Sequence, residues 1–246
     1  MVRSSLLHFW LVSLCALIGI GVTLSLGRWQ LSRAAQKVAL QTEVQEGKKL
    51  AALDAKELLA TKNIATEIYH PVQLRGTWLP RYTVFLDNRE MNETAGFFVM
   101  TPLQLEHSDT VILVQRGWVQ RNFLNRTALP AVDTPAGTVE VSGRIAPPPS
   151  KLFAFKGADT GVIRQNLDLV QFRAETRLPL LGVSVVQTGA PSEGLQRDWP
   201  PVNTGVETNY GYAFQWFALS GLIAILYVWF QIVRRFIAPT RQRPPV

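Results

Sequence analysis

Residues 6–26 read LLHFWLVSLCALIGIGVTLSL, and residues 212–233 read YAFQWFALSGLIAILYVWFQIV. Neither stretch contains Asp, Glu, Lys or Arg. Each is about 20 residues long, and at about 1.5 Å per residue a helix of that length crosses a hydrocarbon core of about 30 Å. The two stretches predict a membrane α-hairpin of two transmembrane helices, with one large domain inserted between them.

The charges next to these stretches predict the orientation of the hairpin. Segment 234–246 carries four arginines and no acidic residue. Because Lys and Arg near a span end are retained in the cytoplasm, both termini are expected to be cytoplasmic, and the central domain periplasmic, in a bacterial inner (cell) membrane. Arg28, Arg33 and Lys37 follow the first span and argue the other way. They count for less, since long loops cross the membrane largely regardless of their charge.

The first apolar stretch is interpreted as an anchor and not as a cleaved signal peptide. It is longer than the usual apolar region of such a peptide, and Ser25–Arg28 lacks a clear cleavage site with small residues. Cys15, in the middle of this stretch, is the single cysteine. One cysteine excludes an internal disulfide and a cysteine-based zinc site.

The net charge of +7 does not point to nucleic acid. Five of the surplus cations flank the two spans, and residues 28–211 carry 20 Lys and Arg against 18 Asp and Glu. The central domain is therefore close to neutral, and it shows no basic stripe with interleaved aromatic residues. A nucleic acid partner is not expected, whereas membrane lipid is.

The region between the spans divides into a stalk and a domain. Residues 27–66 are rich in helix formers and predict a helical stalk, with a break at Gly47 and a short second helix starting at Asp54 with Glu57 in its first turn. Residues 67–209 predict a periplasmic domain of mainly antiparallel β (α+β) class, a sheet or a small barrel, with one helix at Leu167–Arg177. The expected strands are Pro71–Trp78, Tyr82–Leu86, Gly96–Leu105, Val111–Val119, Thr138–Ile145 and Leu181–Thr188.

The sequence lacks the common catalytic signatures. It contains no nucleophile elbow, phosphate-binding loop, dinucleotide fingerprint or zinc-protease motif. Its three histidines, His8, His70 and His107, are far apart in sequence. Each is expected to be a surface or hydrogen-bonded residue rather than a metal or haem ligand. A binding or assembly module is therefore favoured over an enzyme, which would need an unforeseen pocket with shifted pKa values.

Several short motifs recur in a recognisable order. They are LGRWQLSR (26–33), GTW (76–78), LDNR (86–89), GFFVMTPL (96–103), VQRGWV (114–119) and NYGYAFQWF (209–217). In this order, with an apolar span at each end, they resemble the Surfeit locus protein 1 family of cytochrome c oxidase assembly factors. The resemblance covers nearly the whole chain.

The resemblance implies a non-catalytic role in the respiratory chain. Such proteins are thought to assist the delivery or insertion of haem a into the catalytic subunit of a haem-copper oxidase, near the periplasmic surface. The implied partners are that subunit and a haem A synthase, and the implied cofactor is a transiently bound haem a. A haem-independent scaffold that stabilises an assembly intermediate is the alternative.

Five residues near the outer ends of the spans are the candidates for haem contact. Arg28 and Arg33 suit haem propionates, since guanidinium binds carboxylates bidentately, and lipid phosphates are the competing ligands. Trp29 and Trp216 suit either a haem or the membrane interface. Tyr210 stands where many family members carry the histidine associated with haem a. Tyrosine ligates ferric iron only when its phenol is activated, so binding is expected to be weak, shared with a partner or absent.

The remaining motif residues are expected in the domain. Asp87 and Arg89 flank Asn88 and predict a turn after a strand. Arg116 precedes Gly117 and Trp118, and a glycine there permits a bulge or a close approach of backbone or ligand. These five residues are interpreted as structural, with internal ion pairs, or alternatively as a partner-binding motif.

Overall fold

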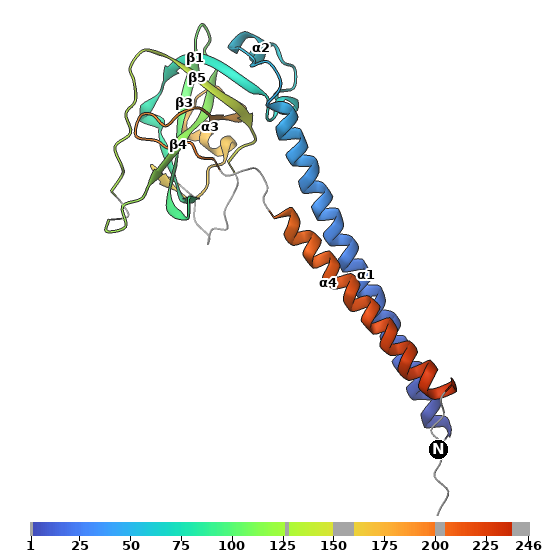
Figure 1. The fold of residues 1–246 in the computed structure, drawn as a ribbon. Coiled ribbons are helices and arrows are strands. Elements are labelled where there is room, and N and C mark those ends of the chain that lie inside the picture. The colour runs from blue at the N-terminus through green and yellow to red at the C-terminus, as the bar shows by residue number, and fades with distance from the viewer. Residues whose placement is uncertain (1, 126–127, 150–159, 200–204, 238–246) are drawn as a thin grey trace, which may run out of the picture. The chain divides into compact units, whose positions relative to one another are not determined.

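The computed structural model describes residues 2–125, 128–149, 160–199 and 205–237, with side chains described from residue 6 to residue 234 (Figure 1). The chain divides into two compact units. One comprises residues 1–42 and 202–246, and the other comprises residues 43–201. Most of the basic tail predicted at 234–246 lies outside the described residues.

The second unit is built around a closed five-stranded barrel. Its strands are β1 (Pro71–Trp78), β3 (Thr94–Leu105), β4 (Val111–Gln120), β5 (Thr138–Ala146) and β7 (Leu180–Gln187). They pair in the order β1–β5–β7–β4–β3, and the ring closes where Gly76–Trp78 of β1 pairs with Leu103–Leu105 of β3. Of the two architectures that the sequence left open, the structure adopts the small barrel.

Two further strands extend the sheet beyond the ring. β2 (Val84–Met91) pairs antiparallel with the first half of β3, and β6 (Ile163–Arg164) pairs with β2. Two of the pairings are parallel, β2 with β6 and β4 with β7. The expectation of a mainly antiparallel sheet is confirmed, because β1–β3, β1–β5, β2–β3, β3–β4 and β5–β7 are all antiparallel.

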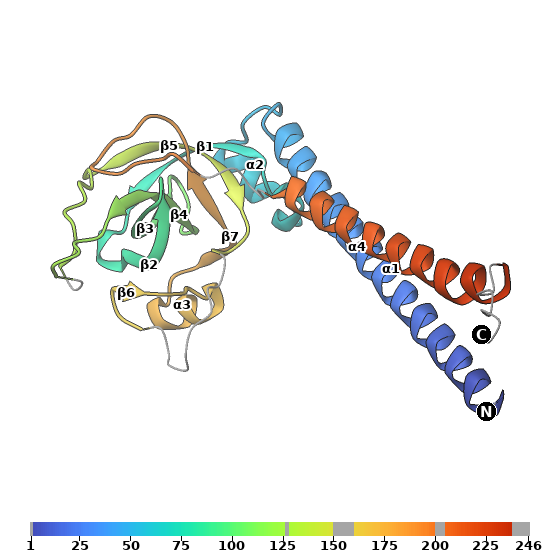
Figure 2. The ribbon, with the colours of Figure 1, turned by 60° about the horizontal axis from the view of Figure 1, so that its bottom comes forward.

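The barrel core forms because alternate residues of the strands are apolar. In β1, every second residue from Val72 to Trp78 is buried, and the residues that alternate with them (Gln73, Arg75 and Thr77) are exposed. In β4 the residues from Val111 to Trp118 are all buried, because both faces of this strand are covered. A second apolar cluster covers the other side of β4 and includes Phe172 of helix α3 (Leu169–Thr176). Figure 2 shows α3 and β6 beside one another at the edge of the barrel.

Short helices connect the first unit's helix to the barrel. Helix α2 (Ala55–Ala60) begins after Asp54, whose carboxylate accepts hydrogen bonds from two backbone amides, and the carboxylate of Glu57 accepts one from the amide of Asp54. This reciprocal cap confirms the predicted helix start. A 3₁₀ turn, η1 (Ile64–Glu67), follows before β1, and a second one, η2 (Pro80–Tyr82), lies between β1 and β2.

The first unit is an antiparallel helical hairpin (Figure 1). Helix α1 (Val2–Gly47) includes the first apolar stretch and continues without a break through the first part of the predicted stalk. Helix α4 (Val206–Tyr227) is followed by a π-helical turn, η3 (Val228–Ile237). By length and composition, both helices qualify as candidate membrane spans.

Small and polar residues line the contact between the two helices. Gly27 lies against Phe217, and a Cβ atom at Gly27 would come within 2.7 Å of that ring. The Ser13 hydroxyl lies 2.8 Å from the Tyr227 hydroxyl, and the Asn209 amide donates to Gln30 Oε1 at 2.6 Å. These pairs fix the antiparallel register, since small side chains allow close approach and polar side chains bond across the contact.

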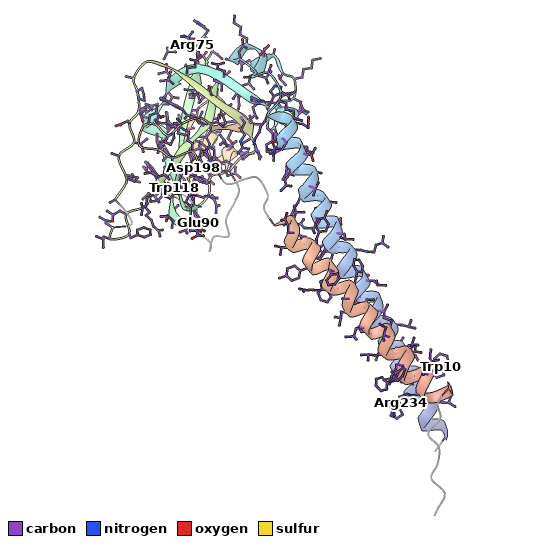
Figure 3. All side chains as sticks on the ribbon, viewed as in Figure 1. Trp10, Arg75, Glu90, Trp118, Asp198 and Arg234 are labelled. Carbon is purple, nitrogen blue, oxygen red and sulfur yellow. The ribbon has the colours of Figure 1, made fainter. Side chains whose placement is uncertain are left out.

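Aromatic residues mark both ends of the apolar part of the hairpin. Trp10 and Arg234 lie at the same end of the hairpin (Figure 3), and Trp29 lies on α1 toward the other end. The separation of 19 residues between Trp10 and Trp29 corresponds to about 29 Å of helix, close to the hydrocarbon thickness. Both tryptophans are more than half exposed, as expected for interface anchors.

One local prediction was wrong. The turn expected at Asp87–Arg89 is part of β2, which continues to Met91 through a bulge between Leu86 and Arg89. Asn88 has a φ of 56° there, a conformation that asparagine tolerates better than most residues, so a turn-like sequence fits inside a strand. Helix α4 begins at Val206, six residues before the apolar stretch, because Asn209 and Tyr210 extend it as helix.

Candidate functional site

The β2 bulge places Asp87 and Arg89 on two different contacts. The carboxylate of Asp87 accepts a hydrogen bond from Nη1 of Arg121, at 3.1 Å. The guanidinium of Arg89 is buried, donates to the carbonyl of Gln165 at 3.0 Å and lies over the Phe98 ring. Burial lowers the pKa of Arg89. Both side chains therefore join the bulge to neighbouring segments of the barrel.

Trp118 belongs to the same group of contacts. Its indole Nε1 donates to the backbone carbonyl of Arg89 at 2.9 Å, and its ring lies on Gly96, where a Cβ atom would come within 2.5 Å. Trp118 and Glu90, the neighbour of Arg89 in β2, lie in the same part of the barrel (Figure 3). The motifs that contain Arg89, Gly96 and Trp118 are thus three parts of one packed cluster.

Arg116 is the extra residue of a bulge in β4. Val99 of β3 pairs with Gly117 and Met100 pairs with Gln115, so Arg116 has no partner in the register. Its side chain is fully buried over the Trp78 ring, with the guanidinium carbon 4.7 Å from the ring centre. It donates to the hydroxyl of Thr134 at 2.8 Å and to the carbonyl of Asp133.

The segment after β7 completes the environment of Arg116. Nη2 of Arg116 lies 2.8 Å from Oε2 of Glu193. Gly117 lies against Leu195, where a Cβ atom would come within 2.5 Å of the leucine Cβ. Arg116 therefore forms an internal ion pair, and Gly117 permits the close approach of Leu195.

A second buried arginine joins this segment to β4. Nε of Arg197 donates to the carbonyl of Arg116 at 2.8 Å, and its guanidinium lies 3.6 Å from Glu193. Burial lowers the pKa of Arg197; Glu193 raises it and Arg116 lowers it further. Two buried guanidinium groups therefore share one carboxylate, and backbone carbonyls and the hydroxyls of Thr134 and Ser192 accept further hydrogen bonds from them.

The five residues predicted near the outer ends of the spans do not form one pocket. Arg28 and Arg33 are five residues apart on α1, which places them about 140° apart around the helix axis. Trp29 and Arg33 are four residues apart and share a face. On α4, Tyr210 is half exposed, whereas Trp216 is partly buried about 120° away around the helix axis. Each helix thus presents these side chains on more than one face.

Sequence reasoning missed the partners of the motif residues. Motif residues bind three side chains that stand in no recognisable sequence pattern. These are Arg121, Glu193 and Arg197. A weak signal was present, because arginine is rare in barrel interiors and Arg116 requires a carboxylate partner. Which acidic residue serves as that partner depends on the fold.

A pocket in the described part of the domain lies away from these contacts. Among the residues that the structure describes, no group of three or more His, Cys, Asp or Glu could hold a metal ion. A pocket of about 560 Å³ lies between α2 and β1 and is lined in part by Arg75, Glu106 and His107. None of the ten site residues predicted from the sequence lines this pocket.

Comparisons with known proteins agree with the motif order. The model of the SURF1 family matches residues 17–221. A SURF1-like protein of Rickettsia bellii (strain RML369-C) is 26% identical over 224 residues, which cover 87% of this chain and 88% of the relative. One of Rickettsia felis (strain ATCC VR-1525 / URRWXCal2) is 27% identical over 227 residues, covering 88% and 95%. One of Rickettsia conorii (strain ATCC VR-613 / Malish 7) is 33% identical over 107 residues, covering 43% and 40%.

Proposed function

The chain belongs to the SURF1 family, and on that premise we propose that it assists the assembly of a haem-copper cytochrome c oxidase. The observation that carries this proposal is the family match from residue 17 to residue 221, which includes part of each helix of the hairpin and the whole barrel. The role is non-catalytic. Its partner is the catalytic subunit of the oxidase, with a haem A synthase as a second partner.

We further propose that the chain acts during haem a delivery or insertion, at the outer end of the hairpin. At that end, an arginine side chain suits a haem propionate and a tryptophan side chain suits the edge of the haem ring. Trp29 and Arg33 share a face of α1. The residues nevertheless do not make a complete haem site. Arg28 projects from a different face, and Tyr210 offers a phenol where an imidazole is the more common ligand. A contact shared with the partner subunit fits them better.

The alternative is a scaffold that stabilises an assembly intermediate without binding haem. The observation that favours it is the position of the motif residues in the barrel. Arg116 and Trp118 are buried, and both donate hydrogen bonds to other groups of the domain itself. In this form of the proposal, the motif maintains the shape of a docking domain, and the exposed surface of that domain binds the partner.

The proposed location is a bacterial inner membrane, with both termini cytoplasmic and the barrel periplasmic. The two candidate spans and the arginines after Val233 support this orientation. A periplasmic barrel would be on the side where the resemblance implies that haem a is inserted.

Deletion of the gene tests the proposed function. We expect a lower haem a content and lower cytochrome c oxidase activity in membranes, with quinol oxidases that use other haems unaffected. Full oxidase activity in a deletion strain without a paralogue would reject the assembly role. Comparing haem a that copurifies with the full-length chain, expressed with and without haem A synthase, separates haem delivery from scaffolding.

A further inference from the structure

A second pocket of the barrel unit lies where strand β4 ends and the next segment begins. Its volume is about 340 Å³. Polar residues at the end of β4 and apolar residues a few positions later line it, namely Gln120, Arg121, Asn122, Ala128, Leu129 and Pro130. Among these described lining residues one side chain is charged, that of Arg121, and none is acidic. The pocket therefore offers hydrogen-bond donors beside an apolar surface.

The β2 bulge holds the guanidinium of Arg121 by one of its nitrogen atoms. Nη1 donates to Oδ1 and Oδ2 of Asp87, at 3.1 and 3.4 Å, and to Oδ1 of Asn88 at 3.4 Å. The arginine is only 9% exposed. Its side-chain hydrogen bonds to the described residues all leave from Nη1, so the contact with the bulge fixes the orientation of the group without using its other edge.

That other edge, formed by Nε and Nη2, is not used within the described parts of the chain. Nε of Arg121 is buried without a hydrogen-bond partner there. Nε of Arg116 lacks a partner as well, but the Arg116 side chain is fully buried, so no ligand reaches it without opening the barrel. Arg121 instead lines a pocket. Because an unpaired buried donor is costly, an acceptor that enters this pocket gains the hydrogen bond that the fold leaves unmade.

The chemistry of this edge favours a carboxylate as the acceptor. The N–H groups of an arginine edge are parallel and match the two oxygens of a carboxylate. Asp87 already balances the charge of Arg121, so a group with one negative charge fits better than a doubly charged phosphate. Asn122 adds a donor, because its Oδ1 accepts from the amides of Leu124 and Asn125 at 2.9 and 3.1 Å, which leaves its NH₂ group for a ligand.

Exposed apolar side chains extend this surface beyond the pocket. Leu129, in the lining, is 41% exposed, and Phe123 and Leu124 are 58% and 99% exposed. The guanidinium carbon of Arg121 lies 5.8 Å from the centre of the Phe123 ring. A small free acid would leave most of these side chains in water. A polypeptide segment with apolar residues next to an acidic one covers the pocket and the apolar side chains together.

We propose that the pocket at Arg121 is a docking site for an Asp or Glu side chain of a partner polypeptide. Arg121 binds the carboxylate, and the apolar neighbours of that acid pack on Phe123, Leu124 and Leu129. Asp87 is a positioning residue, since it fixes Nη1 and leaves the other edge of the guanidinium toward the pocket. The proposal does not rest on the assembly function, because it concerns the chemistry of the bound segment and its test contains no oxidase.

Photo-crosslinking of a defined peptide to the full-length chain in phosphatidylcholine nanodiscs tests the site. The probe is a blocked tripeptide, acetyl-photoleucine-glutamate-photoleucine-amide, at a concentration far below saturation, and mass spectrometry locates the labelled residues. We expect labelling within residues 120–130. The yield should be roughly tenfold lower for the same peptide with glutamine in place of glutamate, because charge-assisted hydrogen bonds are lost. Acetate at the peptide's concentration should not compete, since it lacks the apolar contacts.

Three variants separate the docking site from general effects on the fold. Gln120→Glu places a carboxylate at an exposed position in the pocket and should remove the preference for the glutamate peptide. Gln196→Glu makes the same change at an exposed position outside this pocket and should keep the preference. Asp87→Asn should reduce labelling by the glutamate peptide and leave labelling by the glutamine peptide unchanged, whereas a purely structural role of Asp87 would reduce both.

Two results would overturn the proposal. The first is equal labelling of residues 120–130 by the glutamate and glutamine peptides in the wild type, which would leave only apolar contact. The second is labelling of Phe123 and Leu124 by a phosphatidylcholine with a photoreactive acyl chain while the peptide gives none, which would show that a bilayer covers this surface.

Discussion

Arg116 on β4 and Glu193 in the segment after β7 form an ion pair at 2.8 Å, although 77 residues separate them in the sequence. The arginine side chain is fully buried and the glutamate side chain 18% exposed. A buried pair is not necessarily stabilising in itself, but one charge left without its partner is costly. The pair thus holds the segment that follows β7 onto the β4 bulge, and this leads to a first prediction.

Replacing Arg116 should destabilise the barrel strongly. In Arg116→Ala, Glu193 loses its closest cation and the Asp133 carbonyl loses a donor, so we expect the free energy of unfolding to fall by about 3–5 kcal/mol. Denaturant unfolding of the purified full-length chain measures this change. The control is Arg75→Ala, because Arg75 is 64% exposed and its contact with Glu106 is 3.6 Å long, so its loss should cost less than about 1 kcal/mol. Equal effects of the two substitutions would contradict the structural role of Arg116.

Acid should weaken the contact between β6 and α3. The hydrogen bond from Arg164, at 2.7 Å, is the main cause that lowers the pKa of Glu175. A carboxylate with a lowered pKa stabilises the fold above its unfolded value of 4.5 and loses that contribution as the pH falls through the folded value. We therefore expect Glu175→Gln to be less stable than the wild type near neutral pH, with the difference disappearing in acid. Unfolding curves at several pH values measure this, and a difference that grows in acid would refute it.

A large side chain at Gly27 should separate the two helices of the hairpin. In Gly27→Ile the new atoms would overlap the Phe217 ring, whereas in Gly21→Ile they would meet no atom within 4 Å of the Cβ position. The measurement is disulfide formation between Gln30→Cys and Asn209→Cys in a Cys15→Ser background, because these two side chains touch in the structure. The yield should fall with Gly27→Ile and stay high with Gly21→Ile, and equal yields would show that the contact is placed wrongly.

The secondary structure was largely predictable because local patterns determine it. The strand Pro71–Trp78 was predicted with its observed ends, since its alternation and its flanking residues are both clear. Helix α3 lies within the predicted Leu167–Arg177, where Asp168 caps its first turn. These signals involve residues close in sequence, so no knowledge of the tertiary fold is needed to find them.

The features of the fold that the sequence did not predict depend on contacts between distant segments. The two-residue strand β6 is too short to give a pattern, and it exists because Phe85 and Leu86 pair with it. The bulge at Arg116 follows from the register between β3 and β4, which a single strand does not reveal. In the hairpin, the sequence motifs identified the candidate haem-contact residues, but they did not show in which direction each side chain points. Helical geometry places Arg28 and Arg33 on different faces of α1.

Reporter fusions should establish the orientation of the hairpin. Since the arginines follow Val233, a reporter fused to the C-terminus should be active only if it functions in the cytoplasm. A reporter inserted near Pro148, between β5 and β6, should be active only if it functions in the periplasm. A cytoplasmic result at Pro148 would reject both the orientation and the proposed compartment of the barrel.

Substitution of Tyr210 tests the proposed haem contact. Tyr210 is half exposed on α4, so a new side chain there can reach a ligand without repacking the hairpin. Tyr210→His supplies an imidazole, the more common haem ligand, and should retain more haem a than the wild type when coexpressed with haem A synthase. Tyr210→Phe keeps the ring at the membrane interface and should change little. The absorption spectra of the three purified proteins give the amount of bound haem, and loss of haem in Tyr210→Phe alone would show that the phenol is the ligand.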